Sequence, residues 1–368
     1  MTPDAPLIDR SLFGPGPTNT YPEADAALVR PLLGHLDPVF IQLMDETCEM
    51  LRTLWGTTNA RTLPLSATGS GGMEAAFVNT VHRGDVVVVA INGLFGQRMA
   101  ELASRLGARV VPVESEWGRP LDPDDVLRAH PSPAIICAVH AETSTGVRND
   151  VAALGAGKGD ALLLTDHVTS IGGMPLAADD WGIDVAYAGT QKCLSVAPGL
   201  APFTINDRAF ERRVERPTSW YFDLGLLGGY VGGDAGGKRT YHHTAPTAMV
   251  VSLHAALTRI LSEGLDAVTA RHEAAGAALQ EGLQEMGLEL FAAEGYRLPQ
   301  LTTVRVPDGV DSAKVRAYLL QTFSIEIGAG VGEFADSVWR IGLMGHNAQP
   351  RSVALVLGAL KQAIAATR

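Results

Sequence analysis

The run Val86-Val-Val-Val-Ala-Ile91 is apolar throughout, with no alternation between apolar and polar residues. Such continuity is typical of a strand in a sheet that is covered on both faces, so a strand is expected over Val86–Asn92. Five further apolar runs predict strands at Val110–Pro112, Ala134–His140, Ala161–Asp166, Val185–Gly189 and Ala201–Ile205. Helical patterns such as Phe95–Leu106 lie between them. This alternation predicts an α/β fold with a mostly parallel mixed sheet.

The sequence pattern changes after residue 247. An apolar stripe from Met249 to Leu261 predicts a long helix that stops at Gly264. Further helical stripes and the alternating run Leu301–Val306 predict a smaller α+β domain. We therefore expect an N-terminal arm (1–13), a large domain (14–263) and a small C-terminal domain (264–368).

Composition and charge exclude several classes of function. The chain has 29 basic and 40 acidic residues, and a net charge of −11 argues against nucleic acid as a partner. No apolar run is long enough to cross a membrane, and the N-terminal segment lacks the apolar core of a signal peptide. Cys48, Cys137 and Cys193 are far apart and lack metal-ligand spacing. We expect a cytoplasmic protein without a metal site.

One lysine stands out, in the run Tyr187-Ala-Gly-Thr-Gln-Lys-Cys-Leu-Ser-Val-Ala-Pro-Gly199. Lys192 follows an apolar strand and lies among small residues, where poor solvation lowers the pKa of an ammonium and frees the amine to react with an aldehyde. Asp166 ends the preceding predicted strand, and ligands in open α/β sheets bind at the carboxyl ends of strands. Taken singly, Lys192 could be an ordinary loop lysine, and Asp166 could simply be the N-cap of a helix.

A Gly-rich turn precedes a helix in Ser66-Ala-Thr-Gly-Ser-Gly-Gly-Met-Glu-Ala-Ala-Phe-Val78. Free N–H groups and the positive end of the helix dipole favour a phosphate there, with Thr68, Gly69 and Ser70 as donors. Most such turns only cap helices, and this one matches neither the Walker A nor the dinucleotide pattern. Together with Lys192 and Asp166, however, the turn predicts a site for pyridoxal 5′-phosphate. Lys192 would hold C4′ as an aldimine, and Asp166 would keep the pyridinium nitrogen protonated.

With these parts assembled, the chain resembles the class V aminotransferases of the alanine/serine–glyoxylate (or pyruvate) type, which have the fold type I architecture. The resemblance spans nearly the whole chain. The matching stretches include Gly14–Asn19, Gly34-His35, Asn92–Arg98, Glu142–Gly146, Tyr241–Pro246 and Arg340–Gly345.

The resemblance implies roles for several further residues. Phe95 would stack on the cofactor ring, Val168 would line the cofactor site, and Gln191 would contact the phosphate beside Ser70. Thr143 would lie beside the ring and contact the substrate. Ser70 and Phe95 replace the histidine and tryptophan that are common in relatives, which leaves the substrate open. Phe95 could also be an ordinary core residue.

The resemblance also implies a substrate clamp and a second subunit. Arg340 would bind the substrate carboxylate, and Gly16 would line the substrate site. Tyr241 and Thr244 would reach the phosphate of the other subunit, which implies a homodimer with shared active sites. Arg340 could instead form an ordinary salt bridge, and Tyr241 and Thr244 could be plain strand residues.

The expected reaction transfers an amino group from a small amino acid (alanine or serine) to glyoxylate or pyruvate, with ping-pong kinetics. Ureidoglycine–glyoxylate, pyridoxamine–pyruvate and 2-aminoethylphosphonate–pyruvate transaminases are the alternatives. A cysteine desulfurase would need a nucleophilic cysteine late in the chain, and none follows Cys193. A cofactor-sensing regulator would need a DNA-binding domain, for which the residues before Phe13 leave no room.

Overall fold

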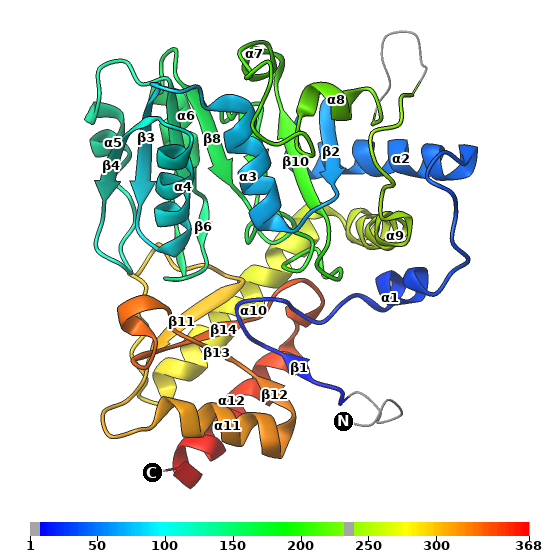
Figure 1. Ribbon diagram of the computed structural model, residues 1–368. Coiled ribbons are helices and arrows are strands. Elements are labelled where there is room, and N and C mark those ends of the chain that lie inside the picture. Colours follow the sequence, from blue (N-terminus) through cyan, green and yellow to red (C-terminus); the bar gives the residue numbers. More distant parts are fainter. Residues whose placement is uncertain (1–7, 232–238, 368) are drawn as a thin grey trace.

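A seven-stranded sheet forms the centre of the larger part of the molecule (Figure 1). The computed structural model describes residues 8–231 and 239–367. In spatial order the strands are β2 (Arg61–Leu65), β10 (Ala201–Ile205), β9 (Val185–Tyr187), β8 (Leu162–Asp166), β5 (Ile135–Val139), β3 (Val86–Ile91) and β4 (Arg109–Glu114). The strands from β9 to β4 are parallel, whereas β10 runs antiparallel to both β9 and β2. The α/β class with a mostly parallel mixed sheet is confirmed.

The six strands expected from apolar runs are all present, but β2 is an addition. Its sequence, Arg61-Thr-Leu-Pro-Leu65, is short and contains Pro64, which cannot donate a backbone hydrogen bond. β2 is at the edge of the sheet and pairs only with β10. Proline is tolerated in such an edge strand because one side of the strand needs no partner.

Nine helices of the described chain accompany this sheet: α1 (Pro22–Leu28), α2 (Pro38–Trp55), α3 (Gly69–Thr80), α4 (Leu94–Arg105), α5 (Pro123–Arg128), α6 (Val151–Gly157), α7 (Asp207–Glu211), α8 (Leu224–Gly228) and α9 (Thr247–Glu263). Helix α3 contacts β9 and β10, α4 contacts β3, and α2 contacts both β2 and α9. Local chemistry sets their ends: Asp37 accepts a hydrogen bond from the N–H of Val39 at the start of α2, and left-handed Gly56 ends it. None of the described helices is long and apolar enough to cross a membrane.

A smaller sheet and three helices form the second part of the molecule, drawn below the large sheet in Figure 1. Its elements are α10 (Leu265–Glu285), β11 (Leu301–Arg305), α11 (Ser312–Phe323), β12 (Ile325–Glu326), β13 (Gly328–Ala329), β14 (Val338–Gly342) and α12 (Pro350–Thr367). Strand β14 lies between β11 and β13 and is antiparallel to both. The strand β1 (Ser11–Leu12) pairs with β12, so this early segment of the described chain packs with the smaller part.

The buried apolar side chains form two large clusters that follow this division. One contains the seven-stranded sheet and its helices, and the other contains β11, β14 and the last two helices. Helix α10 contributes Val268 to the first cluster and Leu279 to the second. We propose Gly264, where α9 ends at a φ of 91°, as the domain boundary. Phe13 belongs to the second cluster, so the end of the 1–13 arm packs with the small domain.

Candidate active site

Asp166 and Lys192 lie at the same edge of the large sheet. Asp166 is the last residue of β8, and Lys192 follows the end of β9 in the next loop. These strands are parallel neighbours, so both loops leave from their carboxyl ends. Both side chains are buried, with 3% of Asp166 and 7% of Lys192 exposed. The two groups are close enough for each to change the pKa of the other.

The amine of Lys192 is enclosed by the segment that precedes α1. Its Nζ donates a hydrogen bond to the carbonyl oxygen of Pro15. A Cβ atom at Gly16 would be 2.6 Å from both Cδ and Nζ of Lys192, and Gly16 has a φ of 112°. Burial, followed by the nearby charge of Arg340, lowers the pKa of Lys192 to about 8. About a tenth of Lys192 is therefore a neutral amine at pH 7, far more than for a solvent-exposed lysine.

Asp166 is held in place by the backbone of the following loop. Its Oδ1 accepts a hydrogen bond from the N–H of Val168 at 2.8 Å. Burial raises the pKa of the carboxyl to about 7, because the ionised form loses its hydration. The hydroxyl of Tyr187 is buried close by, yet it has no partner of normal hydrogen-bond geometry among the described residues. This corner of the site is suited to a cationic N–H group.

The Gly-rich turn at the start of α3 lies next to this part of the site, and we term it the proposed phosphate cradle. Thr68 is the N-cap of α3, but its side chain makes no capping hydrogen bond, so the N–H groups of the first turn remain available to a ligand. A Cβ atom at Gly69 would be 2.8 Å from Cγ2 of Val168. The Oε1 atom of Gln191 is buried and has no hydrogen-bond partner among the described residues. It lies 2.8 Å from the position that a Cβ atom at Gly189 would occupy. Rotation of this amide exchanges oxygen for nitrogen and would offer a donor to a phosphate.

Arg340 reaches the site from β14 of the small domain. Its Nε donates to the carbonyl oxygen of Ala329 at 2.7 Å, and its Nη1 donates to that of Thr143 at 3.4 Å. Arg340 forms no ion pair with any described residue, so the ordinary salt bridge is not observed. Burial lowers the pKa of the guanidinium to about 10. A half-buried cation without a counter-ion favours a bound carboxylate.

A carboxylate for which the sequence indicated no role lies against the start of α4. Glu142 is fully buried, and its Oε2 accepts hydrogen bonds from the N–H groups of Phe95 and Gly96 at 3.2 and 3.4 Å. Its Oε1 accepts from the N–H of Ser144 at 3.0 Å and from the Ser144 hydroxyl. Glu142 was visible in the sequence only as part of a motif. Nothing in its spacing showed that it caps a helix fifty residues earlier in the chain.

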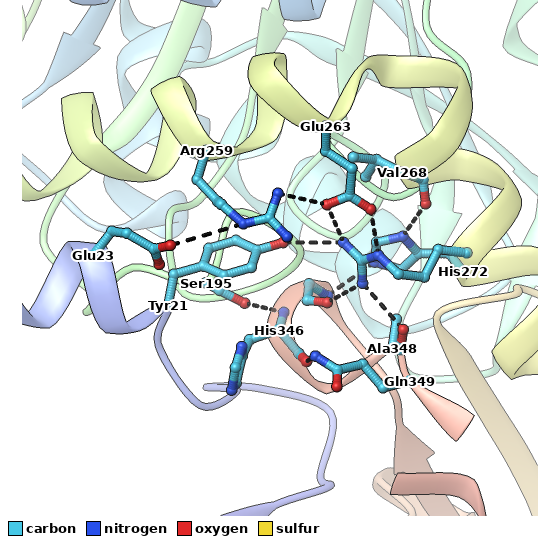
Figure 2. Close-up of polar contacts among 12 residues, drawn as sticks. Tyr21, Glu23, Ser195, Arg259, Glu263, Val268, His272, His346, Ala348 and Gln349 are labelled. Carbon is cyan, nitrogen blue, oxygen red and sulfur yellow. Dashed lines mark hydrogen bonds and ion pairs between the residues drawn. The ribbon is translucent and has the colours of Figure 1, made fainter. Parts of the chain in front are cut away.

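A network of hydrogen bonds joins the lysine loop to the small domain (Figure 2). The Ser195 hydroxyl accepts a hydrogen bond of 2.8 Å from the N–H of His346, which lies just beyond β14. His272 of α10 donates from Nδ1 to the carbonyl of Val268 at 2.7 Å and accepts at Nε2 from the N–H of Gly345 at 2.9 Å. These partners require the neutral Nδ1–H tautomer of His272. The loop after Arg340 is therefore tied directly to the loop after Lys192.

Arg271 strengthens this connection with charged hydrogen bonds. Its Nη1 donates to the carbonyl oxygens of Gly345 and Ala348 at 2.6 and 3.1 Å. Its Nε and Nη2 form a bidentate pair with Glu263 at 2.6 and 3.2 Å, and Nη2 also reaches the Tyr21 hydroxyl at 3.3 Å. Together with His272, Arg271 forms what we term the interdomain clamp, which links α9, α10, the segment before α1 and the loop after β14.

Tyr241 and Thr244 are not brought to Lys192 by contacts within the described chain. Tyr241 is 62% exposed, and its hydroxyl is 3.4 Å from that of Thr244. Neither lies in a strand. Between them, His243 hydrogen-bonds the hydroxyl of Ser66, two residues before Thr68, at 2.7 Å. The segment thus lies next to the proposed phosphate cradle but presents its tyrosine to the surface.

Comparisons with known proteins identify the family of the chain. The pattern of the family described as Aminotransferase class-V matches residues 18–347. The chain belongs to the class V aminotransferase family and is an aminotransferase with amino acid and 2-oxo acid substrates.

Three relatives are similar over almost their full length. The chain is 39% identical to alanine–glyoxylate aminotransferase of Drosophila melanogaster, over 98% of this chain and 93% of the relative. It is 38% identical to (S)-ureidoglycine–glyoxylate transaminase of Bacillus subtilis (strain 168), over 96% and 90%. The crystal structure of an alanine–glyoxylate aminotransferase from Nostoc sp. matches with a TM-score of 0.95 and 42% identity, over 99% of this chain and 97% of that one.

Proposed function

We propose that this chain is a pyridoxal 5′-phosphate-dependent transaminase that transfers an amino group from alanine or serine to glyoxylate or pyruvate by a ping-pong mechanism. The observation that carries this proposal is the burial of Lys192 and Asp166 at the carboxyl ends of adjacent parallel strands. The relatives named above support glyoxylate as the acceptor, because each is named for it.

The unpartnered polar groups of the site fit this cofactor. Asp166 has a pKa raised to about 7, and a pyridinium N–H would stabilise its ionised form. Gln191 and the N-terminal turn of α3, with Thr68, Gly69 and Ser70, would hold the phosphate. Lys192 would hold the aldehyde carbon, and Val168 and Phe95 would line the ring. When bound, the cofactor supplies an electron-accepting ring that stabilises negative charge at the substrate α-carbon.

Lys192 would act as the proton carrier of the reaction. Its pKa of about 8 lies close to neutral pH, where a general base combines a sufficient free fraction with adequate basicity. The hydrogen bond to Pro15 keeps its Nζ on the side of the pocket closed by Gly16. Asp166 would keep its own charge throughout and hold the ring nitrogen protonated.

Arg340 would bind the substrate carboxylate, assisted by Thr143 and Gly16. The guanidinium already uses Nε and Nη1 on backbone carbonyls, and these two bonds fix its plane. The Thr143 hydroxyl contacts that of Thr169, and the Thr143 carbonyl accepts from Arg340, which supports a place for Thr143 beside the arginine. A small carboxylate substrate would thus be held next to the amine of Lys192.

We further propose a homodimer in which Tyr241 and Thr244 reach the phosphate of the other subunit. Aromatic side chains gather on the surface around this segment: Tyr241 contacts His35 with ring centroids 5.3 Å apart, and Trp220 stacks on His242 at 4.4 Å. Trp220 and Tyr241 are each 62% exposed in the single chain. Exposed aromatic clusters of this kind favour a protein interface. A cytoplasmic location is proposed because all three cysteines are free and buried.

A half-reaction screen tests the proposed function. The purified protein with bound cofactor is mixed with one amino acid at a time, and the loss of the visible absorbance of the lysine-linked cofactor is followed. We expect alanine or serine to convert the cofactor and glyoxylate to restore it. Conversion by ureidoglycine and not by alanine or serine would select the second candidate, favoured by the Bacillus relative. A protein that retains no cofactor would contradict both.

A further inference from the structure

Glu142 occupies an unusual position for a carboxylate. It ends the short strand β6 (Ala141–Glu142), and its side chain is fully buried against the first turn of α4. A Cβ atom at Gly93 would be 2.4 Å from both Cγ and Cδ of Glu142, so no other residue type fits before this helix without moving the carboxylate. Buried carboxylates are retained only where they are paired or well hydrogen-bonded. Here the carboxylate accepts four hydrogen bonds from the backbone and hydroxyl donors of Phe95, Gly96 and Ser144.

These hydrogen bonds connect Glu142 to two sides of the active site. The N–H of Phe95 lies on the residue whose ring would cover the cofactor. The Ser144 hydroxyl, which donates to Glu142, also accepts from the N–H of Leu94 at 2.9 Å. Thr143, directly between Glu142 and Ser144, offers its carbonyl to Arg340. A negative charge at the start of α4 is favoured by the helix dipole.

Glu142 also contributes to the charge balance of the pocket. The charged or titratable groups that act on Lys192 are Arg340, Cys193, Asp166 and Glu142. Arg340 and Lys192 are two cations without an ion-pair partner in the described chain, and Glu142 raises the pKa of each. Burial raises the pKa of Glu142 itself, and its hydrogen bonds from Ser144, Gly96 and Phe95 oppose that rise. Four donors around one carboxyl group favour the ionised form.

We propose that Glu142 is a positioning residue of the active site: its buried, ionised carboxylate fixes the first turn of α4 with Phe95 and supplies a resident negative charge for Lys192 and Arg340. The inference rests on the proposed function only for the role of Lys192 as the reacting amine. It explains how two cations are kept in one half-buried pocket before a carboxylate substrate arrives. A carboxylate in direct contact with Arg340 would compete with the substrate for the guanidinium. Glu142 directly precedes Thr143 and forms no ion pair with Arg340, so the guanidinium stays available.

The charge is tested by titrating Lys192 in the full chain after bound cofactor has been removed. The rate at which acetic anhydride labels Lys192 is measured against pH by peptide mass spectrometry, with Lys314 and Lys361 as references in the same sample. The wild-type midpoint is expected near the pKa of about 8. Glu142→Gln should lower the midpoint measurably, because a charge that favours the ammonium is lost. Ser144→Ala, which removes the hydroxyl donor that favours the ionised form of Glu142, should shift the midpoint in the same direction but by less than Glu142→Gln does.

The positioning role is tested by amide hydrogen exchange at Phe95 and Gly96. Glu142→Asp keeps the charge but is one methylene too short to reach both the helix and Ser144. We expect faster exchange at these two amides with a Lys192 midpoint close to wild type, so this variant is informative even if Glu142→Gln does not fold. An unchanged Lys192 midpoint in folded Glu142→Gln, or unchanged exchange in Glu142→Asp, would overturn the proposal. Neither readout needs turnover, so a failed half-reaction screen would be a separate result.

Discussion

At the scale of single residues, the site is defined by how little room surrounds Lys192. The amine is buried, its Nζ is hydrogen-bonded to the carbonyl of Pro15, and Gly16 lies against its last carbons. Burial and the charge of Arg340 bring the pKa of Lys192 to about 8. A lysine that is both shielded and partly neutral is a good nucleophile and proton carrier.

Gly16→Ala should disable the site by displacing this amine. The added Cβ would be 2.6 Å from Nζ of Lys192, and a φ of 112° is one that side-chain-bearing residues rarely adopt. We expect kcat/KM to fall at least about tenfold, since small displacements of a reacting group are costly. Gly358→Ala in α12 is the matched control, because nothing lies within 4 Å of its added Cβ. The control should keep full activity and gain about 0.5–1 kcal/mol of stability. Wild-type activity in Gly16→Ala would contradict this packing.

Arg340→Ala should mainly weaken the binding of carboxylate substrates. The guanidinium has no ion-pair partner among the described residues and faces the pocket next to Lys192. Loss of a charge-assisted contact worth about 1.5–3 kcal/mol should raise KM roughly ten- to a hundredfold for both the amino and the oxo acid, with a smaller change in kcat. Arg305→Ala, which removes a partly exposed ion pair with Glu289, should leave both constants near wild type. A large fall in kcat at unchanged KM would argue against the carboxylate clamp.

The sequence was sufficient to predict that Lys192 and Asp166 lie at the same edge of the sheet. Lys192 and Asp166 follow apolar strands, and parallel strands bring their ends to one edge. The contacts of Glu142 and Tyr187 could not be predicted, because they depend on how a loop folds back over a distant helix start. The same limit applies to Gly16, whose role came from resemblance to a family and not from any periodicity.

At the scale of elements, the interdomain clamp determines how the small domain sits against the lysine loop. His272 and Arg271 of α10 hold the backbone at Gly345, three residues after β14 ends. A Cβ atom at Gly345 would be 2.1 Å from Oγ of Ser195 and 2.5 Å from the carbonyl oxygen of Cys193. The two loops therefore approach each other so closely that only glycine fits at position 345. This contact helps to set the position of Arg340.

Stability should fall between pH 6.5 and 5 because three buried histidines, His140, His167 and His272, remain neutral in the folded chain. Burial lowers the pKa of His140 and of His272 from 6.5 to about 4. Over this range the unfolded chain takes up protons that the folded chain does not, so stability decreases as pH falls, by roughly 1 kcal/mol per pH unit for each histidine. Asp166, whose pKa burial raises to about 7, opposes part of this fall because it takes up a proton in the folded chain over the same range. The free energy of unfolding in urea at pH 7 and pH 5 measures this change.

A variant isolates the share of His272. His272→Asn should be less stable at pH 7 because the hydrogen bond from Gly345 is weakened, but its loss of stability between pH 7 and pH 5 should be smaller than that of the wild type. An equal pH dependence in His272→Asn and wild type would show that His272 does not remain neutral in the folded chain.

Element prediction succeeded for the strands buried on both faces and for the long helix α9, whereas the similarly long helix α2 was not predicted. Helix α9 was expected over 247–263 and is observed as Thr247–Glu263. Strands β2 and β14 could not be predicted from apolar runs, since Pro64 interrupts the first and Arg340 lies in the middle of the second. In β14 the polar residue that interrupts the apolar pattern is Arg340, the residue proposed to bind the substrate carboxylate.

At the scale of the whole molecule, the single chain leaves an aromatic surface next to its proposed phosphate cradle. Tyr241 and Trp220 are exposed there, and His243 ties the segment to Ser66 before α3. This arrangement supports the proposal that Tyr241 and Thr244 act across a dimer interface. Such an interface is expected to be isologous, with the same patch used by both subunits.

Complementation between two inactive variants tests this sharing. Lys192→Ala lacks the amine, whereas the double variant Tyr241→Ala/Thr244→Ala lacks the expected phosphate contacts. When equal amounts are unfolded and refolded together, hybrid dimers should contain one intact site each, which restores about a quarter of wild-type activity by random pairing. Activity no greater than the sum of the two separate variants would show that these residues serve their own chain.

The most direct measurement of the central claim is the site of covalent attachment. The protein is incubated with pyridoxal 5′-phosphate, reduced with borohydride and digested, and the labelled peptide is identified by mass spectrometry. The sequence offers five lysines, at positions 158, 192, 238, 314 and 361. The account predicts stoichiometric label on Lys192, lost in Lys192→Ala while the circular dichroism spectrum stays that of a folded protein. Label on another lysine, or a fully active Lys192→Ala variant, would contradict it.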